Sequence, residues 1–135
     1  MIDKTHASGR IEVDTYEPSI YDKGEDGAPD IVEIHVAERF TGDITGQGKV
    51  RFLQTIFADG SASFVGVERV TGSIAGRSGA FVLQDAGTVE GTVVSGTWFV
   101  VPGSGTGELA GLRGDGGFRA DLGQNAEITL DYWFE

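Results

Sequence analysis

The side chain best placed for chemistry in this sequence is the carboxylate of Glu68. It shares one face of a predicted strand with Phe64, Gly66 and Val70, because side chains two residues apart point the same way. In an apolar cavity its pKa would rise, and it would serve as a catalytic general acid or base. The structural alternative is an ion pair with Arg51, which lies opposite Glu68 in the predicted register.

Aromatic residues on other predicted strands supply the walls of such a cavity. Trp98, Tyr132 and Phe64 suit an apolar ligand with one polar group, and Arg51 completes the predicted ligand-binding set. The alternative for these aromatic residues is packing in the core or in an interface, where aromatic side chains are common.

Other polar residues are weaker candidates. Glu38 and Gln54 also lie on predicted strands, where hydrogen bonding within the sheet is their simpler role. His6 and His35 fall on different strands with no third ligand at a metal-binding spacing. There is no cysteine, and no serine stands in a nucleophile elbow. We therefore expect neither a metal nor a cofactor.

One glycine-rich segment invites a nucleotide-binding interpretation. Residues 105–110 (Gly-Thr-Gly-Glu-Leu-Ala) fit a loose G-x-G-x-x-A pattern after a strand, but that fingerprint also needs a helix to hold the pyrophosphate. Gly111, Gly114 and Gly116 interrupt any such helix, at about 1 kcal/mol each relative to alanine. The segment is instead predicted to be a corner between two strands.

Period-two alternation and regularly spaced glycines predict about eight antiparallel strands and no helix. Residues 16–30 are predicted to form a long loop, and the Gly42-Asp43 and Gly46–Gly48 segments to form turns. Asp59-Gly60 predicts a two-residue hairpin loop that pairs Arg51 with Glu68. The expected strands lie at residues 6–15, 31–41, 50–57, around 64–68, 80–86, 91–101, 117–122 and from 125 onward.

Such a set most naturally closes into one eight-stranded antiparallel β-barrel domain over residues 1–135, with a two-sheet sandwich as the alternative. Strands around the hairpin carry large apolar groups on both faces, so a homo-oligomer, with a dimer favoured, is expected. The net charge of -11 disfavours binding to nucleic acid or anionic membranes. No signal peptide or membrane-spanning run is visible, which makes the cytoplasm the expected location.

Three segments carry a resemblance that covers most of the chain: residues 64–72, 76–84 and 101–112, together with the closing Leu-Asp-Tyr at 130–132. The chain resembles a family of small, functionally uncharacterised bacterial proteins. That family is similar in fold to the allene oxide cyclase and dirigent barrels, which are calycin-like, and to small barrel cyclases of polyketide pathways. The resemblance implies an oligomeric barrel around an apolar cavity, but it identifies no active-site residue.

The function expected from the sequence is therefore binding of a small apolar molecule. The barrel would act as a cofactor-independent isomerase or cyclase that works by positioning its substrate. Two alternatives stay open: a non-catalytic carrier or sensor of a hydrophobic ligand, and a filled structural barrel that acts through its oligomer surface.

Overall fold

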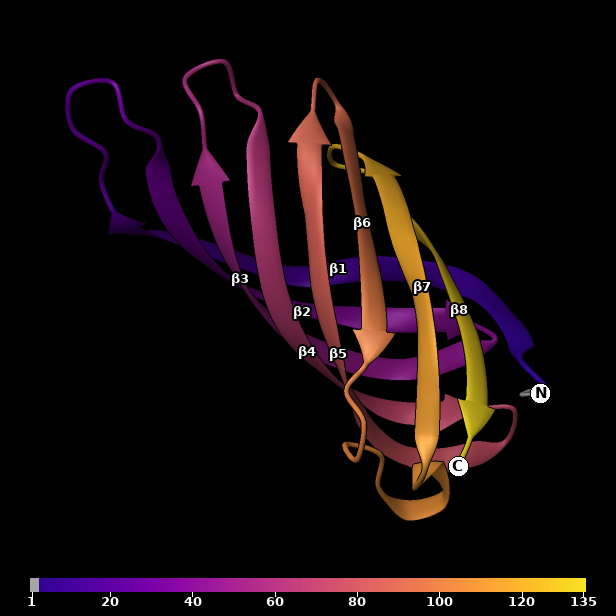
Figure 1. The fold of residues 1–135 in the computed structure, drawn as a ribbon. Helices are drawn as coiled ribbons and strands as arrows, with labels where there is room; N and C mark the ends of the chain where they lie inside the picture. Colours follow the sequence, from indigo (N-terminus) through magenta and orange to yellow (C-terminus); the bar gives the residue numbers. More distant parts are fainter. Residues whose placement is uncertain (1–2) are drawn as a thin grey trace.

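The computed structural model describes residues 3–135, which form one closed antiparallel barrel in which each strand pairs with the next and β8 pairs with β1. This confirms the predicted eight-stranded barrel and excludes the sandwich. Four hairpin connections lie at one end, the upper end in Figure 1, and the β6–β7 corner and C-terminus lie at the other. The strands are β1 (Thr5–Asp22), β2 (Asp30–Gly42), β3 (Ile44–Ile56), β4 (Ala62–Ile74), β5 (Arg77–Glu90), β6 (Val93–Val100), β7 (Leu112–Asp121) and β8 (Ala126–Phe134).

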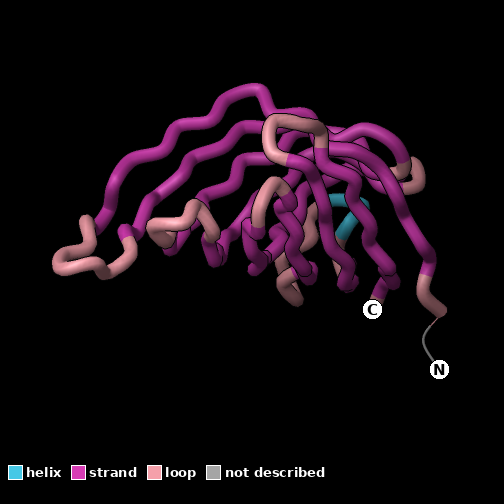
Figure 2. Tube along the Cα trace, turned by 90° about the horizontal axis from the view of Figure 1, so that it is seen from above, coloured by secondary structure: helices cyan, strands magenta, loops and turns pink. Residues whose placement is uncertain are grey.

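The lower end of the barrel is packed solid. Alternate residues from all eight strands point inward and form the main apolar core, which includes Phe81, Leu83, Leu130 and Tyr132. Figure 2 shows, from above, how the strands curve over the interior. Burial of these side chains supplies most of the favourable free energy of folding.

The glycine-rich corner closes this end. It contains one 3₁₀ turn, Gly107–Leu109, and no α-helix, and Leu109 enters the core with 0% of its surface exposed. Strand β6 ends at Val100, opposite Leu83, so the first residues of β5 have no partner on β6. The corner supplies hydrogen bonds to the backbone of β5 there. The Ser104 hydroxyl accepts a hydrogen bond from the backbone N–H of Val82 at 3.0 Å, and the backbone N–H of Thr106 donates to the carbonyl of Ala80 at 2.8 Å.

The upper end is open because β1 leaves the barrel. Its pairing with β8 stops at Ile11 opposite Ala126, whereas its pairing with β2 continues to Asp22 through an irregularity between Val13 and Thr15. Such a bulge bends a strand and increases its twist. The outer half of β1 therefore stands away from β7 and β8.

Several predicted boundaries were wrong. Residues 16–22 continue β1 and do not form a loop, and the connection to β2 is confined to residues 23–29. Gly46–Gly48 lies inside β3, and β3 begins directly after the turn at Gly42, whose φ of +103° suits glycine. Strand β7 begins at Leu112, earlier than predicted. In each case neighbouring strands supply backbone partners that override the local glycine or proline signal.

The β3–β4 turn has three loop residues (58–60) where two were predicted. The backbone N–H of Phe57 donates to the carbonyl of Ser61 at 2.9 Å. The Asp59 carboxylate accepts a hydrogen bond from the backbone N–H of Ser61 at 2.9 Å, and Gly60 has a φ of +88°. This is the pattern of a type I turn completed by a glycine bulge.

The extra loop residue shifts the β3–β4 register by one position. Arg51 lies opposite Val67, and Glu68 lies opposite Val50, so the predicted Arg51–Glu68 pair was wrong. A shift of one residue moves alternate side chains to the other face of the sheet. Glu68 consequently points inward, while Arg51 points outward and pairs with Glu33.

We predict that the corner contributes to stability through Leu109. A Leu109→Ala substitution would leave a cavity in the closed end and lower the free energy of unfolding by about 2–5 kcal/mol. Leu122, which is exposed near the upper end, offers a matched control, and Leu122→Ala should change it by less than about 0.5 kcal/mol. Urea titration measures both, and equal losses would show that the corner does not seal the core.

Candidate functional site

Three carboxylates lie inside the barrel. Glu38 on β2, Glu68 on β4 and Asp85 on β5 are 7%, 1% and 4% exposed. Among residues 3–135 they are the buried charged side chains, and no lysine, arginine or histidine is buried with them. Because an ionised carboxylate loses its hydration on burial, these groups need protons, hydrogen-bond donors or a ligand.

Glu38 and Glu68 form a carboxyl pair across β3. Gly48 lies opposite Glu38 on the strand between them, and a Cβ atom at Gly48 would overlap the Glu68 carboxylate. The two carboxyl groups lie close enough to shift each other's pKa, and a hydrogen bond between them forms only when one of them carries a proton, since an ionised carboxylate has no donor.

Burial raises the pKa of Glu68 well above its usual range, and the hydrogen bond to Glu38 and the charges of Glu38 and Asp85 raise it further. Burial also raises the pKa of Glu38, although its hydrogen bond with Glu68 opposes that rise. Both acids therefore keep a proton to a higher pH than an exposed glutamate does.

Asp85 is the third acid and has no carboxyl partner. It lies opposite Gly66 of β4, where an added Cβ would come within 2.6 Å of both the Asp85 Oδ1 atom and the Phe52 ring. Burial, and secondarily the charge of Glu38, raise the pKa of Asp85 to about 7. Asp85 Oδ1 and Glu68 Oε2 are buried with no hydrogen-bond partner.

All three acids line a cavity of about 520 Å³ that opens at the upper end of the barrel. Its volume falls within the range of small-molecule sites, about 300–1,000 Å³. The mouth lies where β1 separates from the β7–β8 connection, so that Tyr16 and Leu122 contribute to it. The walls are mostly apolar and include Val36, Phe52, Val94, Trp98, Phe118 and Ala126.

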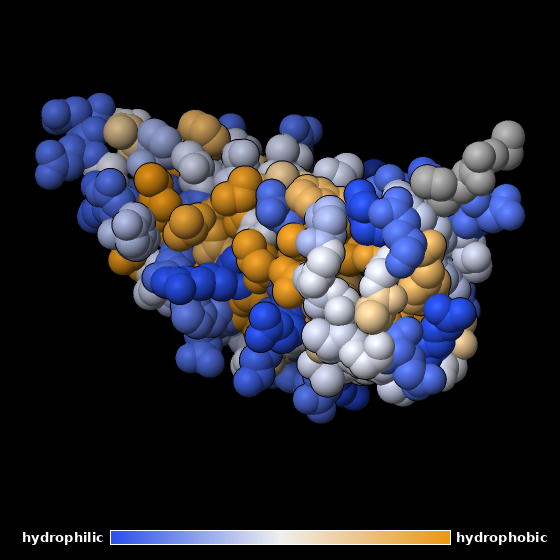
Figure 3. Space-filling model, turned by 60° about the horizontal axis from the view of Figure 1, so that its bottom comes forward, coloured by the Kyte–Doolittle hydropathy of each residue, from blue (hydrophilic) through white to orange (hydrophobic). Residues whose placement is uncertain are grey.

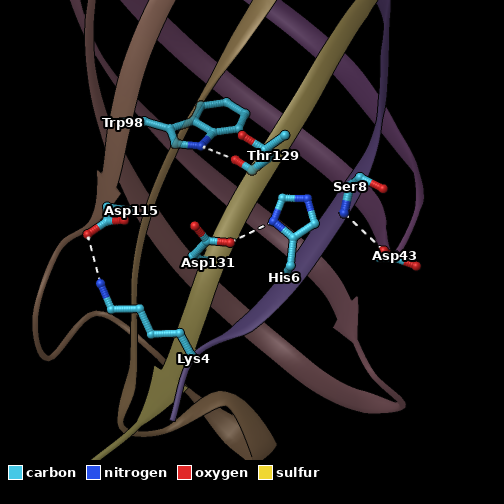
Figure 4. Close-up of polar contacts among 8 residues, drawn as sticks. All are labelled: Lys4, His6, Ser8, Asp43, Trp98, Asp115, Thr129 and Asp131. Atoms are coloured by element: carbon cyan, nitrogen blue, oxygen red, sulfur yellow. Dashed lines mark hydrogen bonds and ion pairs between the residues drawn. The ribbon is translucent and has the colours of Figure 1, made fainter. Parts of the chain in front are cut away.

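Aromatic rings form a continuous row along this wall. The Phe118 ring lies 5.2 Å from Trp98 and 6.0 Å from Phe64, and Phe64 contacts Phe52 edge-to-face at 5.4 Å. The Trp98 indole is fixed by a 2.9 Å hydrogen bond from Nε1 to the carbonyl of Thr129 (Figure 4). The wall is therefore rigid on the side that faces the acids.

The structure separates the predicted site residues. Glu68 and Trp98 line the cavity, and Phe64 is buried behind its wall against Phe118. Tyr132 belongs to the packed lower core, so it lies away from the cavity. Arg51 is on the outer face. Of the weaker candidates, Glu38 joins Glu68, whereas Gln54 is half-buried higher on β3.

Asp85, Phe52 and Phe118 were missed as site residues. Asp85 has the same parity as Phe81 and Leu83 on its strand, and that alternation alone would have directed it inward.

The two histidines lie on the outside. His6 Nδ1 is 2.6 Å from Asp131 (Figure 4), and His35 Nε2 is 3.2 Å from Glu33. Within residues 3–135, no three acidic or histidine side chains are arranged to hold a metal ion. In the same part of the chain, no helix is long and apolar enough to cross a membrane.

A second, shallower depression of about 940 Å³ lies on the outer face. Leu53, Val65, Val67 and Phe99 are exposed there, and Figure 3 shows apolar surface gathered on this face between charged groups. These are the outward apolar groups that led to the expectation of a homo-oligomer, which stays a prediction.

This chain is similar to one protein family and to a solved structure from that family. Residues 7–132 match the model of the family described as "Protein of unknown function (DUF3224)". A solved structure from Shewanella oneidensis MR-1, described as a protein with unknown function from the DUF3224 family, is 30% identical to this chain. The match covers 98% of this chain and 99% of that one, with a TM-score of 0.84. No curated protein matches.

We predict that Asp85 makes stability depend on pH. Its pKa of about 7 in the folded protein exceeds that of an unfolded aspartate, near 4. The folded state therefore binds more protons between these values, and stability falls as pH rises from about 4 to 7. Asp85→Asn mimics the protonated acid and should stabilise the protein at pH 8 by about 2 kcal/mol, after allowance for solvent at the cavity.

This gain should shrink toward zero at pH 4–5, and urea titrations at several pH values would measure it. Asp115→Asn on the outer face of β7 is the control, because Asp115 is exposed and 3.9 Å from Lys4 (Figure 4). A gain from Asp85→Asn that is the same at pH 5 and pH 8 would contradict the prediction.

Proposed function

This chain belongs to the DUF3224 family of proteins of unknown function, and we propose that its barrel binds a small apolar molecule in the upper cavity. The observation that carries the proposal is the pair of unpartnered buried oxygens, Glu68 Oε2 and Asp85 Oδ1. A buried polar atom without a partner costs free energy. Such atoms at the inner end of an apolar cavity suit a ligand whose polar group meets them.

The shape of the barrel supports this proposal. The lower end is filled by core side chains, whereas the upper end keeps about 520 Å³ among rigid aromatic rings. That division disfavours the third hypothesis of a completely filled structural barrel.

Catalysis is the further part of the proposal. Glu68 would act as the acid or base of a cofactor-independent isomerase or cyclase, and the cavity would supply orientation. A proton-bearing Glu38–Glu68 pair and an ionisable Asp85 provide both an acid and a base. Likeness to the allene oxide cyclase barrels belongs to this part of the proposal.

A carrier or sensor is the second candidate. The observation that favours it is the coupling of the Glu38 and Glu68 carboxyl groups, because a proton shared between these acids would be less free to move to a substrate. The cavity would then hold its ligand without changing it.

We predict that the uncharged dye Nile red binds the cavity with a blue-shifted emission. Val94 lines the cavity on β6, and Val94→Trp should fill it and weaken binding at least about tenfold. Thr97 on the same strand is exposed and borders the outer depression, so Thr97→Trp should leave the affinity within about twofold. Loss of binding in Thr97→Trp alone would assign the dye to the outer face and contradict the proposal.

Glu68→Gln separates enzyme from carrier. Native mass spectrometry of freshly purified protein identifies any co-purified molecule, which then serves as the test substrate. An enzyme should lose at least about 100-fold in kcat on Glu68→Gln, because general acid–base catalysis contributes that much or more. Bound molecule with no turnover in the parent protein would support the carrier, and unchanged turnover in the variant would end the catalytic role of Glu68.

A further inference from the structure

The buried charges of the barrel are all of one sign. Glu38, Glu68 and Asp85 converge on one cavity, and among residues 3–135 no basic side chain is buried near them. Even when the Glu38–Glu68 pair carries one proton, the three carboxyl groups can hold up to two negative charges. An anionic ligand would add to this repulsion, whereas a cation would reduce it.

The unpartnered oxygens show what the ligand must donate. Glu68 is 1% exposed and lines the cavity, yet its Oε2 atom receives no hydrogen bond. Asp85 Oδ1 is also buried and receives no hydrogen bond. Asp85 lies diagonally from Glu68 in the β4–β5 ladder, where the backbones of diagonal neighbours are about 7–8 Å apart. An ammonium has three N–H donors, so it can meet Asp85 Oδ1 directly while its charge is attracted by the Glu38–Glu68 pair.

The aromatic residues beside the acids also suit a cation, and Trp98 is the direct cross-strand neighbour of Asp85. Trp98, Phe118 and Phe52 line the cavity, and the faces of aromatic rings attract positive charge. Toward the mouth, the lining combines the aliphatic Val94, Ala120 and Leu122 with the polar Asp121, Gln124 and Asn125. The cavity thus has an acidic inner end, aromatic sides and a mouth lined by both apolar and polar residues.

We propose that the ligand is an apolar primary amine, bound as its ammonium ion. The ammonium lies between Asp85 and the Glu38–Glu68 pair, and the apolar chain passes Trp98 and Phe118 toward the mouth. This inference rests on the proposed function, since it names the ligand class of the same cavity. A quaternary ammonium lacks the N–H donors that the two oxygens need, and an alcohol brings one donor and no charge.

Three probes with the same chain test the charge directly: octylamine, 1-octanol and octanoate. Their affinities are measured at pH 7.5 by displacement of Nile red and checked by calorimetry. We expect octylamine to bind at least about tenfold more tightly than octanol, and octanoate to bind more weakly than octanol.

Variants locate the ammonium. Asp85→Asn should lower octylamine affinity at least about tenfold and leave octanol within about twofold, because it removes a charge without changing shape. Asp115→Asn on the outer face removes the same charge outside the cavity and should change neither affinity. Glu68→Gln provides a second variant at the site, with the same direction expected for octylamine.

The outcomes separate this inference from the proposed function. Equal affinity for octylamine and octanol, or equal loss of both in Asp85→Asn, overturns the amine and leaves the apolar cavity standing. A loss of octylamine affinity in Asp115→Asn as large as that in Asp85→Asn also overturns it, since the attraction would then be to overall charge. Failure of all three probes and of Nile red to bind overturns both.

Discussion

The close approach of the Glu38 and Glu68 carboxyl groups is the contact on which the upper half of this barrel depends. Two carboxyl groups can approach each other in an apolar interior only with a shared proton, and that proton makes their burial tolerable. The approach also requires the strand between them to carry no side chain, which Gly48 provides. Gly66 makes the corresponding space beside Asp85. Glycines inside strands therefore shape the site, while the turn glycines shape the chain path.

The two ends of the barrel have opposite energetic roles. The lower end buries large aliphatic and aromatic side chains and is sealed by Leu109. The upper end contains empty volume, orphaned oxygens and three acids with raised pKa values, all of which lower stability. The strands run through both ends, so the packed half holds the half with the cavity in place. Sites of this kind are commonly less stable than their scaffold.

Alternation in the sequence was enough to predict the barrel, because a half-buried strand repeats every two residues. Glu38 follows the buried alternation of β2, but it was interpreted as a residue that hydrogen-bonds within the sheet. It did not establish the β3–β4 register, since one extra loop residue at the Asp59-Gly60 turn decides whether Glu68 and Arg51 lie on the same face of the sheet. Gly48 looked like part of a turn because its role appears only when β2 and β4 are placed beside β3. The separation of β1 from β8 opens the cavity and depends on the bulge between Val13 and Thr15, which no residue pattern in the sequence predicted.

Asp85 is the acid whose charge can vary most readily. The close approach across Gly48 and the burial of both groups raise the pKa of Glu38 and of Glu68. Asp85 has no such partner, and its pKa of about 7 leaves it partly ionised under ordinary conditions. The cavity therefore changes its net charge near neutrality through this one side chain. A ligand at the inner end of the cavity binds the protonation state of Asp85, neutral or ionised, that best fits its polar group. Its binding therefore shifts the protonation equilibrium of Asp85 toward that state.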